Sequence, residues 1–142
     1  NGEEKYKTTI AAATDSGQVT QEFTFPTVAP GTYDLVVTKA AHLTYTIKNV
    51  VVGDTPLDLT RNSNAAISTM TLLCGDIDGN GYINSTDLGI ILKGQNYGKP
   101  SNTAGVEPAA DLDGNGYINS TDLGIVLQGQ HYGKSAVSVD YA

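Results

Sequence analysis

The chain has 142 residues, 39% of them hydrophobic, and a formal net charge of −7 at pH 7. That length accommodates one domain or two small ones, and no apolar run is long enough to span a bilayer, so membrane insertion is not expected. Because no basic patch could neutralise phosphates, nucleic acid is not an expected partner either.

The first half of the chain has the pattern of short β-strands. Apolar and polar side chains alternate over residues 23–25, 33–37 and 45–47. A period of two with aromatic and β-branched residues indicates half-buried strands, and turn-forming residues such as Pro30-Gly31 separate them. A last strand is expected at residues 67–72, running without a linker into Gly75. The pattern predicts an all-β antiparallel sandwich over residues 1–70.

The stretch from residue 28 to residue 48, which contains Pro30-Gly-Thr-Tyr33, carries a family resemblance. It resembles the Pro-Gly-Thr-Tyr hairpin of small prealbumin-like and collagen-adhesin B-type sandwiches. Some domains of this kind form an internal Lys–Asn isopeptide bond beside a carboxylate, for which Lys7 and Glu22 are candidates, but no matching Asn can be placed. The preferred interpretation is a β-scaffold with solvated lysines.

The second half contains a twelve-residue segment twice, from Asp76 to Asp87 and from Asp111 to Asp122. Each copy has oxygen-bearing side chains at positions 1, 3, 5, 9 and 12 and Gly at position 6, the spacing of an EF-hand calcium loop. The departure is Asp at position 12, where EF-hands usually have Glu. The expected ligands are Asp76, Asp78, Asn80, the carbonyl of Tyr82, Asn84 and Asp87 in the first loop, and Asp111, Asp113, Asn115, the carbonyl of Tyr117, Asn119 and Asp122 in the second.

Each loop brings three carboxylates close together, and these would repel one another without a cation. Turns rich in Asp and Asn also occur without metal, but two near-identical loops favour metal binding. The sequence therefore predicts two bound Ca²⁺ ions and a fold that depends on them.

A short helix is expected after each loop. Asn84 is a suitable N-cap, with Asp87 closing a capping box. Leu88, Ile91 and Leu92 recur at i, i+3 and i+4, which predicts that they form the buried stripe. The second copy repeats the pattern with Asn119 as cap and Leu123, Val126 and Leu127 as the core. Glycines at 98 and 133 are the expected stops, and residues 100–110 connect the copies.

The residues before Asp76 predict a strand instead of the entering helix of an EF-hand. They include Cys74, whose neighbours Leu72 and Leu73 favour a buried, unreactive thiol. A loop followed by one helix, present twice, resembles the F-hand repeats of dockerins over residues 75–99 and 110–134. The two repeats themselves, each starting at the first Asp of its loop, are residues 76–99 and 111–134. The β-sandwich upstream resembles the X module of a scaffoldin C-terminus.

This resemblance implies an X module at residues 1–70 and a small α dockerin at residues 71–142. It implies a calcium-dependent, non-enzymatic module that binds a cohesin domain of a scaffoldin or cell-surface anchoring protein. The expected location is extracellular, in a cellulosome at the cell surface. Since the chain starts at Asn1 and not at Met, we expect it to be a piece of a longer secreted protein.

The helix side opposite the expected core predicts the partner surface. It includes a mid-helix Gly, which costs about 1 kcal/mol relative to Ala and suits close approach of another protein. In dockerins the residues at loop positions 10 and 11 contact the cohesin, so the resemblance adds the Ser-Thr pair of each copy. The expected contacts are Ser85, Thr86, Gly89, Ile90, Lys93 and Tyr97, and Ser120, Thr121, Gly124, Ile125, Gln128 and Tyr132. Two such faces predict two cohesin orientations, with the X module as rigid support.

The alternative function is a calcium-binding structural or adhesion module, or a calcium buffer, that binds no cohesin. A sensor needs an opening helix pair and a Met-rich groove, whereas this chain has one Met and no entering helices. His42 and His131 lie far apart without a nucleophile motif, so His131 is interpreted as a surface or partner contact. The sequence leaves two alternatives for the C-terminal residues 135–142, packing back on the dockerin or disorder, and the apolar Val137, Val139 and Tyr141 favour packing.

Overall fold

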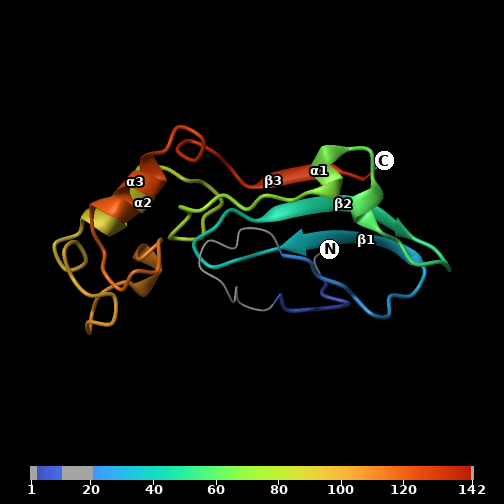
Figure 1. Ribbon diagram of the computed structural model, residues 1–142, viewed down its shortest axis with the longest axis horizontal. Coiled ribbons are helices and arrows are strands. Elements are labelled where there is room, and N and C mark those ends of the chain that lie inside the picture. Colours follow the sequence, from blue (N-terminus) through green and yellow to red (C-terminus); the bar gives the residue numbers. More distant parts are fainter. Residues whose placement is uncertain (1–2, 11–20, 142) are drawn as a thin grey trace.

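The computed structural model describes residues 3–10 and 21–141, which form two lobes side by side (Figure 1). One lobe holds a small sheet and the other holds the two longer helices. The elements in chain order are β1 (Gly31–Val37), β2 (Tyr45–Val52), η1 (Leu59–Arg61), α1 (Ala65–Ser68), α2 (Ser85–Leu92), η2 (Pro108–Ala110), α3 (Ser120–Leu127) and β3 (Val137–Asp140). Within the described ranges, no helix has the length and apolar character needed to cross a membrane.

The sheet lobe is built around the β1–β2 hairpin, which confirms the strands expected at residues 33–37 and 45–47. The two strands pair antiparallel, from Gly31 opposite Val52 to Val37 opposite Tyr45. Tyr45 and Ile47 are buried by the alternation of β2, and Val50 is buried beyond an irregularity in the ladder, where Asn49 has a φ of +60°. These three side chains form a cluster with Ile67 of α1. Burial of these apolar groups is the main force holding the lobe together.

Two expected strands are absent from the described part of this lobe. The backbone near Phe23 and Phe25 belongs to no ladder, although the two rings contact each other edge to face at 6.3 Å. Residues 65–68 form helix α1, not the start of a last strand, because the side chain of Asn64 accepts from the Ala66 amide and caps the first turn. The described residues thus form a single three-stranded sheet.

The third strand of this sheet comes from the C-terminus of the chain. β3 pairs parallel to β2, with Tyr45 opposite Val137 and Lys48 opposite Asp140. The expectation that residues 135–142 pack on the dockerin therefore holds only for Ser135 and Ala136, which pair with the first loop, and β3 packs on the sheet lobe. Its alternating Val137, Val139 and Tyr141 instead cover the apolar cluster of the sheet lobe, where the edge of β2 offers unpaired backbone groups.

The helical lobe contains the two predicted loop–helix repeats. Both capping boxes are present, from Asn84 and Asp87 on α2 and from Asn119 and Asp122 on α3. The expected buried stripe was wrong in one respect, since Leu92 and Leu127 are 54% and 52% exposed. The neighbours Ile90 and Ile125 are half-buried, and Ile90 packs against the core.

The rotation of each helix follows from its carboxylate. Asp87 is fully buried because it faces the loop, and Ile91 lies one turn later on the same side. Centring the buried arc on Asp87 and Ile91 places Ile90 and Leu88 at its two margins and turns Leu92 toward solvent. The sequence-based prediction considered only apolar residues and therefore placed Leu92 in the buried arc of the helix, where it does not lie.

The two lobes share part of their cores. Leu43, just before β2, is only 1% exposed and belongs to the helical-lobe cluster with Ile83, Ile91 and Val126. Beside it, the Leu43 amide donates to the Leu73 carbonyl at 2.8 Å and the Gly75 amide to the Ala41 carbonyl at 2.8 Å. Cys74 lies in this junction, where burial raises the pKa of its thiol to about 11, as expected for an unreactive cysteine.

Because Leu43 fills the helical-lobe core, Leu43→Ala should lower the free energy of unfolding by about 2–5 kcal/mol. Denaturant unfolding in calcium, followed by circular dichroism, measures the loss. Val36→Ala is the matched control, since Val36 is 54% exposed and its truncation should cost less than about 0.5 kcal/mol. Equal losses for both variants would mean that Leu43 does not join the lobes.

Candidate metal centres

Each predicted loop brings its three carboxylates together at the start of a helix. Asp76, Asp78 and Asp87 place oxygen atoms within 4.8 Å of one another, and Asp111, Asp113 and Asp122 do the same. Carboxylate oxygens at this spacing are the ligand type that Ca²⁺ prefers.

The carboxylate at position 12 organises the whole loop. One oxygen of Asp87 accepts from the amides of Ile77 (2.8 Å) and Asp78 (3.3 Å), and the other accepts from the amide of Asn84 (2.9 Å). Asp87, at loop position 12, therefore holds the amides of positions 2, 3 and 9 together while it closes the capping box of α2. In the second loop the amides of Leu112, Asp113 and Asn119 donate to Asp122 at 2.7, 3.2 and 2.8 Å.

The carboxylate at position 1 of the second loop has one oxygen that lacks a hydrogen-bond partner. Asp111 accepts from the Gly116 amide through Oδ2 at 2.9 Å, while its Oδ1 is buried without a hydrogen-bond partner. A buried carboxylate oxygen without a donor is costly unless a cation meets it. The turn that permits this geometry needs φ of +88° at Gly81 and +92° at Gly116, which glycine adopts at little cost.

The electrostatics of the loops also favour a cation. Burial raises the pKa of the Asp76 carboxyl, and its neighbours Asp87 and Asp78 raise it further. In the second loop the Thr121 hydroxyl donates to Asp113 and lowers the pKa of that carboxyl. A divalent cation would stabilise all three charges at once, so the residues present fit calcium.

The other predicted ligands lie around the same points. Oδ1 of Asn80 accepts from the Tyr82 amide at 2.9 Å, and its Nδ2 donates to Asp78 at 3.1 Å. Asn84 is committed to the helix, since its Oδ1 accepts from the Thr86 amide at 3.0 Å. Tyr82 is 56% exposed, and the group it would offer to the ion remains its backbone carbonyl. Asn115, Tyr117 and Asn119 repeat these placements.

Each loop pairs with the segment that follows the helix of the other repeat. Ile118 of the second loop accepts from the Gly98 amide (2.7 Å) and donates to the Lys99 carbonyl (3.0 Å). Ile83 of the first loop accepts from the Gly133 amide (2.7 Å) and donates to the Lys134 carbonyl (2.9 Å). The two repeats are thus exchanged partners, a relation that sequence reasoning missed because the spacing within one copy carries no sign of it.

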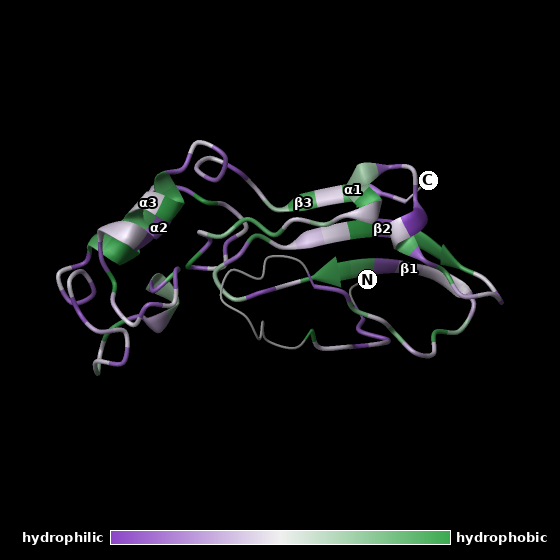
Figure 2. Cartoon of the chain, in the orientation of Figure 1, coloured by the Kyte–Doolittle hydropathy of each residue, from purple (hydrophilic) through white to green (hydrophobic). Residues whose placement is uncertain are grey.

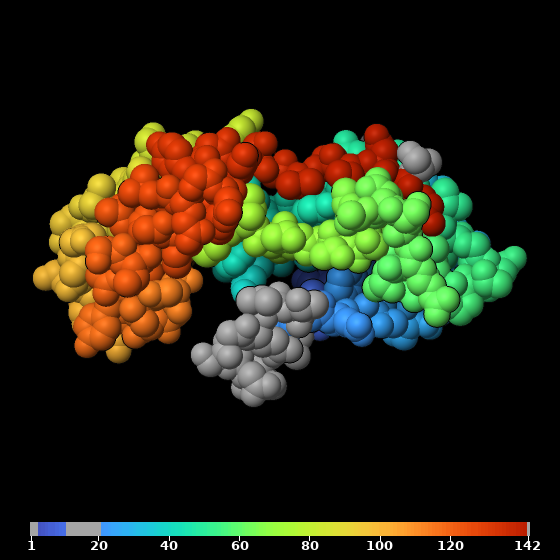
Figure 3. Space-filling model, turned by 45° about the horizontal axis from the view of Figure 1, so that its top comes forward, coloured from blue at the N-terminus to red at the C-terminus, as the bar shows by residue number. Residues whose placement is uncertain are grey.

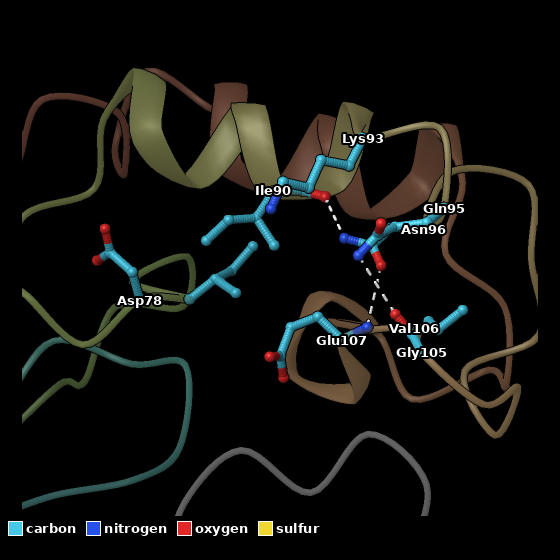
Figure 4. A pocket seen from close by; sticks show the side chains of 9 residues that line it. Asp78, Ile90, Lys93, Gln95, Asn96, Gly105, Val106 and Glu107 are labelled. Carbon is cyan, nitrogen blue, oxygen red and sulfur yellow. Dashed lines mark hydrogen bonds between the residues drawn. The ribbon is translucent and has the colours of Figure 1, made fainter.

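The repeats differ at one position with a structural role. Asn96 is buried and joins α2 to the connection between repeats, donating to the Ile90 carbonyl at 2.6 Å and accepting from the Glu107 amide at 3.0 Å (Figure 4). His131 takes its place in the second repeat, with Nδ1 2.7 Å from the Cys74 carbonyl. Because a carbonyl only accepts, Nδ1 carries the hydrogen. The expectation of a surface or partner role for His131 is replaced by this contact at the junction.

The predicted partner residues lie mostly on one exposed side of each helix. Thr86 and Thr121 also serve the loops, since the Thr86 hydroxyl lies 3.0 Å from an Asp78 oxygen and 2.6 Å from Asn84 Oδ1. Figure 4 shows Ile90 pointing into a pocket beneath α2, away from the exposed side. The residues that are exposed are Ser85, Thr86, Gly89, Lys93, Tyr97, Ser120, Thr121, Gly124, Gln128 and Tyr132. Figure 2 shows apolar residues on the same helices, in keeping with the exposed Leu92 and Leu127.

Comparison with known proteins identifies relatives of this arrangement. A sequence model of the dockerin type I domain matches residues 74–128. A chain from the crystal structure of a C-terminal interface mutant of the type II cohesin-X-dockerin complex from Acetivibrio cellulolyticus is 30% identical, with a TM-score of 0.56; the match covers 78% of this chain and 68% of that chain. A chain from an N-terminal interface mutant of that type II complex is 29% identical over 78% and 67%, with a TM-score of 0.54. No curated protein sequence matches the chain significantly.

Removal of calcium should destabilise the helical lobe, because the carboxylates of each loop then repel one another. At free calcium ~100 times the dissociation constant, each occupied site should add roughly 2.7 kcal/mol to the free energy of unfolding. Urea unfolding in calcium and in chelator measures the difference, with magnesium as the control for a divalent ion of poorer fit. Identical urea midpoints in calcium and chelator would contradict the assignment of the loops.

Proposed function

The chain belongs to the X module–dockerin family, and we propose that it is the calcium-folded module through which its parent protein binds a cohesin during cellulosome assembly. The observation that carries this function is the duplicated loop–helix unit with an exposed side on each helix. The dockerin match spans both loops, and the cohesin-X-dockerin complexes resemble the chain over both lobes. We expect the parent protein to be secreted and to act in the cellulosome at the cell surface.

Each loop is proposed to hold one Ca²⁺ ion, two in all. The carboxylates at positions 1, 3 and 12, the Asn at position 5 and the carbonyl at position 7 would hold the ion, with Asn at position 9 acting through water. The buried, unpartnered oxygen of Asp111 supports this assignment. Bound calcium supplies only charge and rigidity, and the cohesin contacts come from the helices.

The proposed cohesin surface is the exposed side of α2 and α3, which we term the docking surface. Burial supports one change from the sequence-based set, with Leu92 and Leu127 taking the places of Ile90 and Ile125. Exposed leucines beside glycines suit the apolar centre of a protein interface. The docking surface comprises Ser85, Thr86, Gly89, Leu92, Lys93 and Tyr97 of the first repeat, and Ser120, Thr121, Gly124, Leu127, Gln128 and Tyr132 of the second.

The glycines of the docking surface support a partner contact. A Cβ atom added at Gly89 or Gly124 would meet nothing within 4 Å. The folded chain therefore does not require glycine there, although glycine lowers helix stability by about 1 kcal/mol relative to Ala. Close approach of a cohesin backbone accounts for a residue that the isolated protein does not need.

We propose that the two halves of the docking surface are equivalent, so that a cohesin binds in either of two orientations. The matched exposure of Leu92 and Leu127, 54% and 52%, supports this equivalence. So does the exchanged pairing of the loops, which relates the repeats by an approximate two-fold.

The sheet lobe is proposed to be the X module, which supports the dockerin rigidly; the sandwich expected from the sequence is reduced, among the described residues, to one three-stranded sheet covered by α1. The shared Leu43 and the two short hydrogen bonds at the junction support rigidity. We propose that the boundary between the X module and the dockerin lies between residues 70 and 71. β3 follows the dockerin in the sequence but pairs with β2 of the sheet lobe. The alternative, a calcium-binding structural or adhesion module or a calcium buffer, differs in one observable respect, since it binds no cohesin.

The double variant Gly89→Ala/Gly124→Ala should stabilise the free protein by up to about 2 kcal/mol and weaken cohesin binding by at least ~10-fold. The added methyl groups favour the helix but block close approach. Calorimetric titration with a cohesin and denaturant unfolding measure the two effects. Gly53→Ala is the matched control, because Gly53 also has open space around a Cβ and lies in the sheet lobe. Unchanged affinity would remove the glycines from the interface.

The two orientations can be separated by charge at the exposed leucines. Leu92→Glu or Leu127→Glu alone should weaken cohesin binding by only about twofold, because one of two equal modes remains. The double variant should lose binding altogether. Circular dichroism checks that each variant is folded. If one single variant abolishes binding, the two-orientation proposal is wrong and only one half of the surface is used.

A further inference from the structure

The C-terminal segment of the chain touches both a calcium loop and the sheet. Its first part, residues 133–136, pairs with the middle of the first loop. The Ala136 amide donates to the Gly81 carbonyl at 2.8 Å, and Tyr82 lies opposite Ser135 in a β-bridge. Together with the Ile83 hydrogen bonds to Gly133 and Lys134, these contacts cover loop positions 6 to 8.

The next residues of the same segment complete the sheet. Directly after Ala136, the Val137 amide donates to the Thr44 carbonyl at 3.0 Å, and the Tyr141 amide donates to the Lys48 carbonyl at 2.9 Å. The side chains of Val137, Val139 and Tyr141 pack on the sheet-lobe cluster. Figure 3 shows the red C-terminal segment leaving the helical lobe and lying along the sheet lobe. No residue separates the loop contacts from the sheet contacts.

Within the described ranges, the second loop lies beside residues 39–42 but makes no backbone pairing of this kind with the sheet lobe. Its pairing segment is residues 98–101, in which the Ser101 amide donates to the Gly116 carbonyl at 2.9 Å. That segment continues into the connection between the repeats, which Asn96 holds against α2 through Glu107. Among the described residues, no backbone hydrogen bond joins the second loop to the sheet lobe. The first loop is also tied at its start, where Gly75 donates to Ala41.

We infer that calcium binding at the first loop is coupled to the pairing of β3 with the sheet, through residues 133–136, while the second loop binds calcium without this coupling. The inference rests on the proposed calcium sites. Anchoring β3 holds Lys134 and Ala136 against the loop before the ion arrives, so less conformational entropy is lost on binding. By linkage, calcium at the first loop stabilises β3 on the sheet by the same factor.

The test uses the whole chain with a charged residue introduced on the side of β3 that packs on the apolar cluster of the sheet lobe. Val139→Asp puts a carboxylate against the apolar cluster and should detach the strand, whereas Ser138→Asp changes the neighbouring, exposed position of the same strand and serves as the control. Each loop contains its own reporter, because the amides of Gly81 and Gly116 donate to Asp76 and Asp111. A calcium titration followed by these two amide signals in heteronuclear NMR gives one affinity per loop.

In Val139→Asp, the affinity reported by Gly81 should fall by about tenfold and that reported by Gly116 should change by less than about twofold. Equal losses at both glycines, or no loss at either, would overturn the coupling while leaving the calcium sites in place. A Gly81 signal that does not respond to calcium in the unaltered chain would overturn the calcium assignment and the coupling together. If Val139→Asp does not fold, Val139→Ala gives the same comparison with a smaller expected loss.

The reciprocal measurement observes the strand. Asp76→Asn weakens the first loop and should speed hydrogen exchange at the Val137 and Tyr141 amides, which donate to the sheet. Asp111→Asn is the matched change in the second loop and should leave those two amides protected. Equal exchange in the two variants would contradict a coupling confined to the first loop.

Discussion

The structure depends on the requirement to hold three carboxylates of each loop close together. The position-12 carboxylate is the centre of this arrangement, because Asp87 and Asp122 are fully buried and each accepts three backbone amides. Such a group gathers the loop, caps the helix and fixes the direction in which the helix faces. The side of α2 and α3 that is exposed, and that we propose binds the partner, is therefore a consequence of the loop geometry. A cation completes the arrangement by offsetting the repulsion that burial intensifies.

The second organising feature is exchange between segments distant in sequence. Each loop is closed by residues that follow the other helix, and the residues that close the first loop continue directly into β3. Leu43, which precedes β2, packs in the core of the helical lobe, and β3, which follows the helical lobe in the chain, pairs with β2 in the sheet lobe. The two lobes consequently depend on each other for part of their packing. A sheet strand and a calcium loop built from one continuous segment provide a physical route by which the X module can influence the dockerin.

Local patterns predicted much of this structure. The loop spacing, both capping boxes and the β1–β2 hairpin follow from residues near one another, whose signals are strong. The sequence-based predictions failed mainly where the structure depends on contacts that the apolar pattern does not reveal. Leu92 was assigned to the core because apolar spacing was counted without the buried carboxylate of Asp87. The residues after Asn64 were expected to lead into a strand although Asn64 caps a helical turn. The pairing of β3 and the contact of His131 with Cys74 have no local signature, since both require a partner that is distant in the sequence.

The most direct test of the central claim is calorimetric titration of the whole chain with a panel of type I and type II cohesins, in calcium and again in chelator. Both types belong in the panel because the sequence match is to the type I dockerin domain and the structural matches are to type II complexes. Calcium-dependent docking predicts tight one-to-one binding to at least one cohesin, lost on chelation. Calcium uptake without binding to any cohesin would contradict the proposed function and favour a structural or buffering role.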